Sequence, residues 1–363
     1  MFCIFGSHIL PVYKFLHRNV TLIAAIRTMI KKLSNKLLTI GSVAFDSIET
    51  PFGKINKALG GSATYFSLAS SLFTPTAIVG VVGNDFGKFD VYRKREIDIT
   101  GLEKRKGKTF HWSGKYHFDM NTRDTLKTEL GVFADFKPKL DDNHKASEYV
   151  FLGNIQPKLQ LDVLRQIKRP KLIGLDTMNL WIETARKDLF KVMKEIDILV
   201  INDGEARQLS KETNLLKAAK KILRIMGSQK SNALIIKQGE HGLLMFADSI
   251  LSLRGASATK QSKTKIAARP PAARNDISIF NLPGYPLENV IDPTGAGDSF
   301  AGGFMGYLAK TDDLSYANLK KACVYGSAVA SFTVENFGTK ALEILTAKKI
   351  EKRYILYKQL IHI

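Results

Sequence analysis

From residue 37 onward, short apolar runs alternate with longer segments that have a helical period. Short runs of apolar, often β-branched residues are typical of strands covered on both faces, and helical segments between them indicate a parallel sheet with crossover helices. Strands are expected at residues 37–41, 77–82, 149–153, 172–176, 198–202, 233–237 and 243–246, and helices at 63–73, 159–167, 184–196 and 215–226. The pattern predicts an α/β fold with a doubly wound, mostly parallel sheet sandwiched by helices.

Two regions depart from this rhythm. Residues 43–58 and about 108–134 alternate polar and apolar positions and are rich in aromatic residues and Thr. This is typical of antiparallel strands with one exposed face, and it predicts a small β-sheet lid. Residues 251–275 contain no acidic residue and include a Pro-Pro step, which indicates an inserted basic loop. We expect one folded domain over residues 37–345 and a C-terminal tail at 346–363.

The net charge of +20 is concentrated in two segments. Residues 1–36 and 251–275 together supply 12 of these charges and hold no acidic residue. Residues 251–275 contain no aromatic residue that could stack on bases, and we expect no nucleic-acid binding. We interpret residues 1–36 as a poorly ordered basic extension, with a basic amphipathic anchor or targeting segment as the alternative.

Membrane and compartment follow from apolar run length and cysteine content. The uncharged apolar run at residues 19–26 is much shorter than the roughly 20 residues of a membrane-spanning helix. The two cysteines, Cys3 and Cys323, cannot form a disulfide framework. We therefore expect no membrane association and a cytoplasmic location.

The strongest chemical signal is the segment 292–304, Asp-Pro-Thr-Gly-Ala-Gly-Asp-Ser-Phe-Ala-Gly-Gly-Phe. Gly295 and Gly297 leave backbone N–H groups open at the start of an apolar helix, where the helix dipole favours an anion. Asp298 in the first turn places a proton acceptor beside that anion, as is needed to deprotonate a hydroxyl that attacks a phosphate. The structural alternative is that Asp298 caps the helix and that Gly302, Gly303 and Gly306 allow close packing. The chain contains neither a Walker A pattern nor the Gly-x-Gly-x-x-Gly spacing.

This segment resembles the C-terminal signature of the ribokinase-like carbohydrate kinases of the PfkB family, and the chain is similar to that family over about residues 37–345. The resemblance implies a parallel-sheet sandwich with a β lid, an acceptor sugar between lid and sheet, and ATP with Mg²⁺ on the other side. It implies that Asp298 is the catalytic base and that the backbone amides of Gly295, Ala296, Gly297 and Asp298 form an anion hole. It also leaves open a homodimer through the lid.

Further positions match the family on the acceptor side. The resemblance makes Asp46, after the first strand, a ligand of the acceptor hydroxyls, and Gly60-Gly61 the bend that brings the lid toward the sheet. A turn aspartate and an ordinary helix-entry turn are the structural alternatives. The family's usual Asn after the two glycines is absent, since Ser62-Ala-Thr-Tyr65 stands there. The identity of the acceptor therefore stays open.

Polar residues at strand ends and in the lid are further acceptor candidates. Asn154 and the run Asp176-Thr-Met-Asn179 follow two strands at the edge where doubly wound folds bind ligands, and Arg123 lies in the expected lid. Loop hydrogen bonding is the alternative for these residues.

On the nucleotide side, Asn202-Asp-Gly-Glu205 resembles the family's Asn-x-x-Glu, which positions magnesium and its waters. A helix N-cap is the structural alternative. Gly239 and Gly242 resemble the turn that flanks the nucleotide, although a plain hairpin turn has the same appearance. Lys237 precedes this turn and can reach a phosphate. Asp292 and Thr294 match positions that hold a monovalent cation such as K⁺ in some relatives.

Three functions are compatible with these residues. The first is ATP-dependent phosphorylation of a hydroxyl, expected to be a hydroxymethyl, of a small sugar. The second is a nucleoside kinase of the adenosine or inosine type, with Phe110, Trp112 and Tyr116 stacking on the base. The third is a sugar-binding sensor without catalysis, against which the retained Asp298 and glycines argue.

Overall fold

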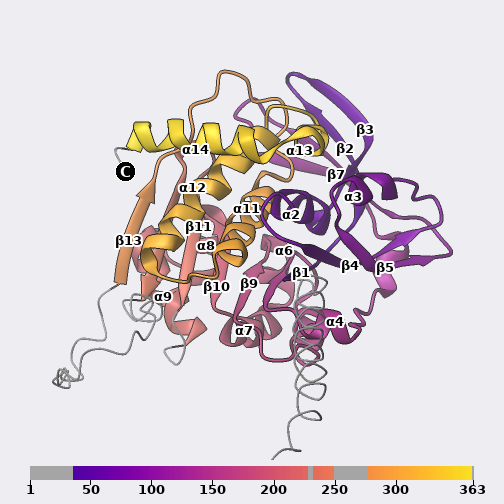
Figure 1. Cartoon of the computed structure of the whole chain (residues 1–363), viewed down its shortest axis with the longest axis horizontal. Helices are drawn as coiled ribbons and strands as arrows, with labels where there is room; N and C mark the ends of the chain where they lie inside the picture. Colours follow the sequence, from indigo (N-terminus) through magenta and orange to yellow (C-terminus); the bar gives the residue numbers. More distant parts are fainter. Residues whose placement is uncertain (1–35, 228–231, 249–276, 362–363) are drawn as a thin grey trace, which may run out of the picture.

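The computed structural model describes residues 36–227, 232–248 and 277–361 (Figure 1). Among these residues the main sheet has the strand order β13-β12-β11-β10-β9-β8-β1-β4-β5. The strands from β5 to β11 in this order are parallel, and β12 and β13 are antiparallel to their neighbours. Their bounds are β1 Leu37–Ile40, β4 Thr76–Gly83, β5 Asp98–Arg105, β8 Tyr149–Leu152, β9 Leu172–Asp176, β10 Ile198–Asn202, β11 Ala233–Lys237, β12 Leu243–Asp248 and β13 Ile277–Leu282. The predicted doubly wound, mostly parallel sheet is confirmed.

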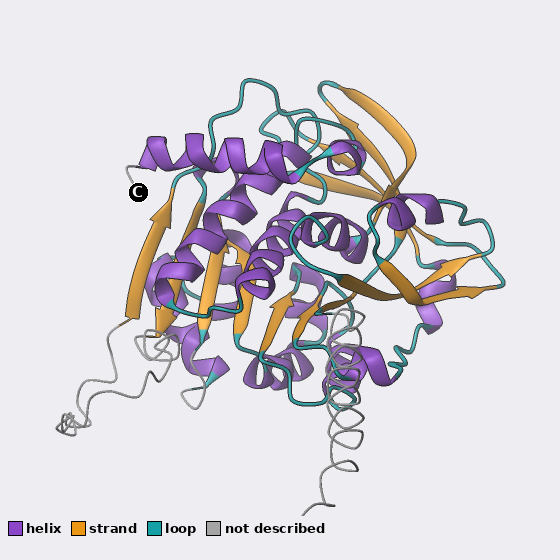
Figure 2. Cartoon of the chain, in the orientation of Figure 1, coloured by secondary structure: helices purple, strands orange, loops and turns teal. Residues whose placement is uncertain are grey.

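Helices cover both faces of this sheet (Figure 2). Successive residues of a strand point to opposite faces, so Leu37 joins the core under α2, α11 and α12, while Leu38 joins the core under α5, α7 and α9. The helices are α2 Ser62–Ser70, α3 Phe89–Lys94, α4 Asp142–Lys145, α5 Pro157–Leu164, α6 Asn179–Thr184, α7 Arg186–Glu195, α8 Asp203–Ser210, α9 Leu215–Met226, α11 Ala296–Thr311, α12 Tyr316–Thr333, α13 Lys340–Ile344 and α14 Ala347–Ile361, with the 3-10 turns η1 Gly131–Asp135 and η2 Gly239–His241.

A second, four-stranded sheet has the order β3-β2-β6-β7 and corresponds to the expected lid (Figure 1). Its strands are β2 Ala44–Thr50, β3 Gly53–Gly60, β6 Phe110–Tyr116 and β7 Arg123–Glu129. The expectation of antiparallel pairing is right for β2–β3 and β6–β7, but wrong for the central pair, because β2 and β6 run parallel. These two strands come from separate parts of the chain, and no hairpin joins them.

The sequence pattern missed the two edge strands of the main sheet. Most residues of β5 and β13 are partly or fully exposed. Edge strands therefore lack the continuous apolar run from which the central strands were predicted. A short additional helix, α6, precedes α7, and the two are separated at Ala185, whose φ is −131°.

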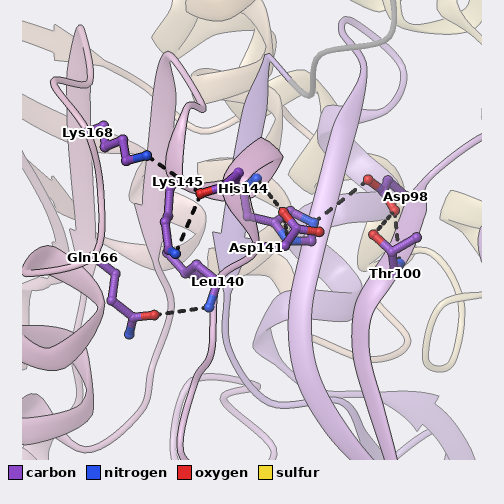
Figure 3. Close-up of polar contacts among 9 residues, drawn as sticks. Asp98, Thr100, Leu140, Asp141, His144, Lys145, Gln166 and Lys168 are labelled. Carbon is purple, nitrogen blue, oxygen red and sulfur yellow. Dashed lines mark hydrogen bonds and ion pairs between the residues drawn. The ribbon is translucent and has the colours of Figure 1, made fainter.

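A polar cluster holds α4 at the amino-terminal edge of the main sheet (Figure 3). Asp141 Oδ1 accepts a hydrogen bond from the backbone N–H of His144 at 2.8 Å and lies 3.0 Å from His144 Nδ1. The buried His144 ring also places Nε2 at 3.7 Å from Asp98 Oδ2, at the start of β5. This contact joins α4 to the edge strand, at the opposite end of the sheet from the carboxyl ends of the strands.

Residues 347–361 form helix α14, which lies across α12 (Figure 1). Tyr357 is buried there, and its hydroxyl donates to the carbonyl of Pro283. The basic extension expected at residues 1–36 lies outside the described residues except for Lys36, and the loop expected at 251–275 lies wholly outside them. Within the described ranges, every helix is too short or too polar to cross a membrane.

Candidate active site

Helix α11 begins at a glycine with a left-handed backbone. Gly295 precedes the helix with φ at 75°, and no side chain caps the helix. Its carbonyl accepts from the Ser299 N–H at 2.8 Å, which closes the first turn. The first amides of a helix have no partner within it, so they are available to an anion. Among the four amides expected to form the anion hole, that of Ala296 is partly committed, because it donates to the Pro293 carbonyl at 3.2 Å.

Two glycines in this turn are required by different neighbours. A Cβ on Gly295 would lie 2.4 Å from ring atoms of Tyr65, and a Cβ on Gly297 would lie 2.5 Å from Lys237 Nζ. Lys237 ends β11, so its amine reaches from the sheet to the first turn of α11. The ammonium group and the positive end of the helix dipole therefore act on the same spot, which favours a phosphate.

Asp298, in this first turn, is half-buried. Burial raises its pKa to about 7, and the negative charge of Asp176 adds to this effect, while Lys237 opposes it. The charge of Asp46 raises the pKa of Asp298 further, and that of Arg123 lowers it. A carboxylate with a pKa near neutrality is well suited to accept a proton from a hydroxyl.

Three adjacent parallel strands end in polar residues at the edge that carries Asp298. Asp176 ends β9, Asn202 ends β10 and Lys237 ends β11. Asp176 is buried and accepts from the Thr177 N–H at 2.9 Å. Burial raises the pKa of Asp176, and Lys237 lowers it. The sequence marked Asp176 only as part of a polar strand end, because its place beside Lys237 depends on the order of the strands in the sheet.

Asn202 and Glu205 form a capping box at the start of α8. Asn202 Oδ1 accepts from the Glu205 N–H at 2.7 Å, and Glu205 Oε2 accepts from the Asn202 N–H at 2.8 Å. The helix cap that the sequence allowed is therefore present. Burial raises the pKa of Glu205 to about 7, and the charge of Asp176 adds to this. Two carboxylates that repel each other gain from a cation placed between them.

A magnesium ion fits this arrangement only as a shared site. In residues 36–227, 232–248 and 277–361, no group of three or more His, Cys, Asp or Glu side chains is arranged to hold a metal. Mg²⁺ in phosphate sites usually keeps several waters and takes one or two carboxylates together with the phosphates. Glu205 and Asp176 meet that requirement.

Asp292 and Thr294, expected near a monovalent cation, hold the turn before α11. Asp292 is fully buried, and its two carboxylate oxygens accept from the N–H groups of Thr294 at 2.9 Å and Gly338 at 2.8 Å. The Thr294 hydroxyl lies 3.2 Å from the hydroxyl of Tyr116 in the lid. The observed contacts of Asp292 are structural, and its role at a cation stays a prediction.

Asp46 lies on lid strand β2 and is 5% exposed. A Cβ on Gly60 would lie 1.9 Å from Asp46 Oδ2, and a Cβ on Gly61 would lie 2.4 Å from the Ser42 carbonyl oxygen. The two glycines thus let the chain pass close to the carboxylate where β3 leads into α2. Burial raises the pKa of Asp46 to about 7, a hydrogen bond from the Gly61 backbone lowers it, and the charge of Asp292 raises it.

The lid presents aromatic and basic side chains on the same face as Asp46. Asp46 pairs with Trp112, and Tyr116 pairs with Arg123. Directly paired residues point to the same face of a sheet, and so do residues two and four apart along one strand. The Arg123 guanidinium lies 5.9 Å from the Trp112 ring centroid, and its charge lowers the pKa values of Asp298 and Glu205. Arg123 therefore acts on the nucleotide side as well as on the acceptor side.

Phe110, the third aromatic residue expected to stack on a base, packs within the lid region. Its ring stacks on Phe133 with 5.4 Å between centroids.

The turn at Gly239 and Gly242 joins the antiparallel strands β11 and β12, so the hairpin geometry is present. Gly242 has φ at 92°, and a Cβ there would lie 2.0 Å from the Leu282 carbonyl oxygen. A Cβ on Gly239 would lie 2.5 Å from Asn121 Oδ1, and Asn121 Nδ2 donates to Glu240 Oε2 at 2.7 Å. The β6–β7 turn of the lid thus reaches the turn that is expected to flank the nucleotide.

Asn154 and Asn179 lie near the same edge of the sheet. Asn154 Oδ1 accepts from Trp181 Nε1 at 2.8 Å, and its Nδ2 lies 3.1 Å from Met178 Sδ. Its amide therefore makes the loop contacts that were the structural alternative. Asn179 is exposed at the start of α6. Acceptor binding by either residue stays a prediction.

Comparison with known proteins confirms the resemblance found in the sequence. Residues 277–345, which include the turn before α11, match the model of the pfkB family carbohydrate kinases. The chain is 26% identical over 277 residues to a cytidine kinase of Thermococcus kodakarensis, covering 74% of this chain and 87% of that protein.

Solved structures show the same fold. A nucleoside kinase of Methanocaldococcus jannaschii, described as an archaeal member of the ribokinase family, aligns with a TM-score of 0.64 and 20% identity, over 89% of this chain and 99% of the other. A putative ribokinase II from E. coli in complex with ATP and Mg²⁺ aligns with a TM-score of 0.64 and 19% identity, also over 89% and 99%. The chain therefore has the ribokinase fold.

Proposed function

We propose that this protein is an ATP-dependent kinase that phosphorylates a hydroxyl, expected to be a hydroxymethyl group, of a small sugar or nucleoside. The observation that carries the proposal is the position of Asp298. It stands in the first turn of a helix whose amino end also receives the Lys237 ammonium group, and its pKa is raised to about 7. A base and a phosphate site thus lie side by side.

Each group of the site has a defined task in this reaction. Bound ATP supplies the phosphoryl group, with Mg²⁺ offsetting part of its charge. Lys237 and the free amides of α11 hold the charge of the phosphate being transferred. Glu205 and Asp176 would hold the metal, directly or through waters. Asp298 takes the proton from the acceptor hydroxyl as the hydroxyl oxygen bonds to the γ-phosphorus of ATP, while the bond from that phosphorus to the β,γ-bridging oxygen breaks and ADP leaves.

The acceptor lies between the lid and the main sheet in this proposal, with Asp46 accepting hydrogen bonds from its hydroxyls. A nucleoside is favoured over a free sugar because Trp112 stands beside Asp46 on the same lid face and offers an aromatic surface to a base. The cytidine kinase and the nucleoside kinase among the similar proteins support this choice. A cytoplasmic location, a homodimer through the lid and dependence on K⁺ stay predictions.

The test is an acceptor screen with ADP formation as the readout. Cytidine, adenosine, inosine, ribose, fructose and 2-keto-3-deoxygluconate are each offered with ATP and Mg²⁺ to the wild type and to Asp298→Asn. We expect at least one acceptor to be consumed, and a kcat for Asp298→Asn that is lower by about 10²–10⁴-fold, as for loss of a general base. Turnover retained by Asp298→Asn would show that Asp298 is not the catalytic base. A wild type that binds acceptors without consuming ATP would be a sensor.

A further inference from the structure

Tyr65 on α2 carries a hydroxyl that the fold does not use. The residue is 1% exposed, and its hydroxyl has no hydrogen-bond partner in the part of the chain that the structure describes. A buried polar group without a partner destabilises the folded state, so such a group in a site calls for a functional reason. A phenylalanine would fill the same space without this cost.

The position of Tyr65 supplies that reason. Its ring packs on Gly295, directly before the catalytic turn. Burial raises the pKa of Tyr65, and the charges of Asp46 and Asp298 are among the groups that raise it further. The Tyr65 phenol therefore lies close both to Asp46, which is expected to bind the acceptor, and to Asp298, the expected base.

Two of the other polar groups near Tyr65 already hydrogen-bond within the protein. Asp292 accepts from Thr294 and Gly338, and the Tyr116 hydroxyl is paired with Thr294. The Tyr65 hydroxyl has no hydrogen-bond partner among the described residues, so it can donate to a ligand without breaking a hydrogen bond within the protein.

The lid explains why this hydroxyl is covered. Asp46 and Tyr116, both on lid strands, are each 5% exposed. Access of an acceptor to Asp46 requires the lid to move away from the sheet, and contact with Tyr65 requires that the same movement also opens a path to its hydroxyl. Tyr65 is thus buried in the same way as Asp46, the residue expected to bind the acceptor.

We propose that the Tyr65 hydroxyl is a specificity-determining contact that hydrogen-bonds a ring hydroxyl of the pentose held by Asp46. This inference rests on the proposed function, and it adds a residue that selects acceptors with a complete pentose diol. Acceptors that lack the contacted hydroxyl would leave the phenol unpaired and bind less well.

Tyr65→Phe tests the inference, with Tyr92→Phe as the matched control. Tyr92 is also a fully buried tyrosine, but its hydroxyl is hydrogen-bonded to Thr64 Oγ1 at 2.9 Å, away from the site. In Tyr65→Phe we expect kcat/KM for the best ribonucleoside to fall about tenfold, the size of one hydrogen bond, with KM for ATP unchanged. Its melting temperature should be equal to or above that of the wild type. Tyr92→Phe should show the opposite pattern, a lower melting temperature with unchanged kinetics.

Deoxynucleosides identify the hydroxyl that is contacted. The tenfold loss caused by Tyr65→Phe should disappear with either the 2′-deoxy or the 3′-deoxy form of the same nucleoside. The form that lacks the contacted hydroxyl has already lost the hydrogen bond to Tyr65, so removing the Tyr65 hydroxyl as well costs nothing more. Equal losses with all three acceptors would overturn the proposed contact, and so would a Tyr65→Phe enzyme that keeps full activity.

Acceptor binding, read as the rise in melting temperature with cytidine or ribose and no ATP, separates this inference from the kinase proposal. A wild-type shift that Tyr65→Phe reduces, without any turnover, would refute the kinase and keep Tyr65 as a ligand. A shift that is unchanged in Tyr65→Phe would refute Tyr65 alone. Absence of any shift and any turnover in the wild type would refute both.

Discussion

At the scale of a single residue, replacing Gly297 should weaken phosphate binding without lowering the stability of the fold. A Cβ at this position would meet only the flexible end of Lys237, 2.5 Å away. The fold can therefore accept Gly297→Ala by moving the ammonium group, but the phosphate then loses a charged partner. We expect KM for ATP to rise about tenfold or more, since hydrogen bonds to charged groups contribute about 1.5–3 kcal/mol. The melting temperature should stay close to that of the wild type.

Gly295→Ala is the contrasting variant in the same turn. Its backbone is left-handed with φ at 75°, and its Cβ would meet the buried ring of Tyr65 at 2.4 Å. Left-handed backbone at a non-glycine residue costs about 1–3 kcal/mol, and the steric clash adds to this. We expect Gly295→Ala to unfold at clearly lower temperature and lower urea concentration. If Gly297→Ala were destabilised as much as Gly295→Ala, the distinction between the two neighbours would be wrong.

At the scale of elements, the packing of α11 on α2 depends on close backbone approach. A Cβ on Gly302 would lie 2.3 Å from the carbonyl oxygen of Phe66, which is backbone and cannot turn aside. The sequence allowed this structural use of the helix glycines, and the geometry bears it out. Gly302→Ala should lower the free energy of unfolding by about 1–3 kcal/mol, as overpacking does, although alanine favours helix.

Urea unfolding measures this effect, and Gly87→Ala serves as its control. Gly87 lies in a loop where an added Cβ meets nothing within 4 Å. Its replacement should change the free energy of unfolding by less than about 0.5 kcal/mol. A Gly302→Ala protein as stable as the wild type would mean that α2 and α11 can move apart without cost.

The lid turn and the turn after β11 form a second contact between elements. Asn121 Nδ2 donates to Glu240 Oε2 at 2.7 Å, and both side chains are largely exposed. Exposed contacts of this kind contribute little to stability, so Asn121→Ala should leave the melting temperature unchanged. We expect it to raise KM for ATP and for the acceptor severalfold, because the lid loses a contact of its closed position. Unchanged values of both KM would show that lid closure does not depend on this contact.

For the whole molecule, the sequence predicted what depends on local pattern and missed what depends on strand order. The central strands and the Asp298 turn have strong local signals, namely continuous apolar runs and glycines before a helix. The edge strands β5 and β13 have no such run. Asp176 and Lys237 became neighbours only through the adjacency of β9, β10 and β11. The Tyr65 hydroxyl, which lacks a hydrogen-bond partner within the described ranges, likewise has no signature in the sequence, because the lack of a partner depends on the three-dimensional surroundings of the side chain.

The joint burial of carboxylates in the site makes the stability of the whole molecule depend on pH. Burial is the main cause that raises the pKa values of Asp46, Glu205 and Asp298 to about 7. In the unfolded chain such groups titrate near pH 4. Between about pH 4 and pH 7 these three groups therefore bind more protons in the folded protein than in the unfolded chain, and their contribution to stability falls as the pH rises through this range. Without nucleotide or metal, we expect a higher melting temperature at pH 5 than at pH 8.

Asp298→Asn tests which groups cause this dependence. The amide cannot ionise, so the variant should be more stable than the wild type at pH 8, and the difference should shrink toward pH 5, where the wild-type carboxyl is protonated. Asp188→Asn is a control, because this surface carboxylate has a pKa lowered by its hydrogen bond to Lys191, and its replacement should not stabilise the protein at pH 8. Two outcomes would contradict this explanation: a wild type that is as stable at pH 8 as at pH 5, and an Asp298→Asn variant that is less stable than the wild type at pH 8. Either would show that the ionised, buried carboxylates of the site do not destabilise the folded protein.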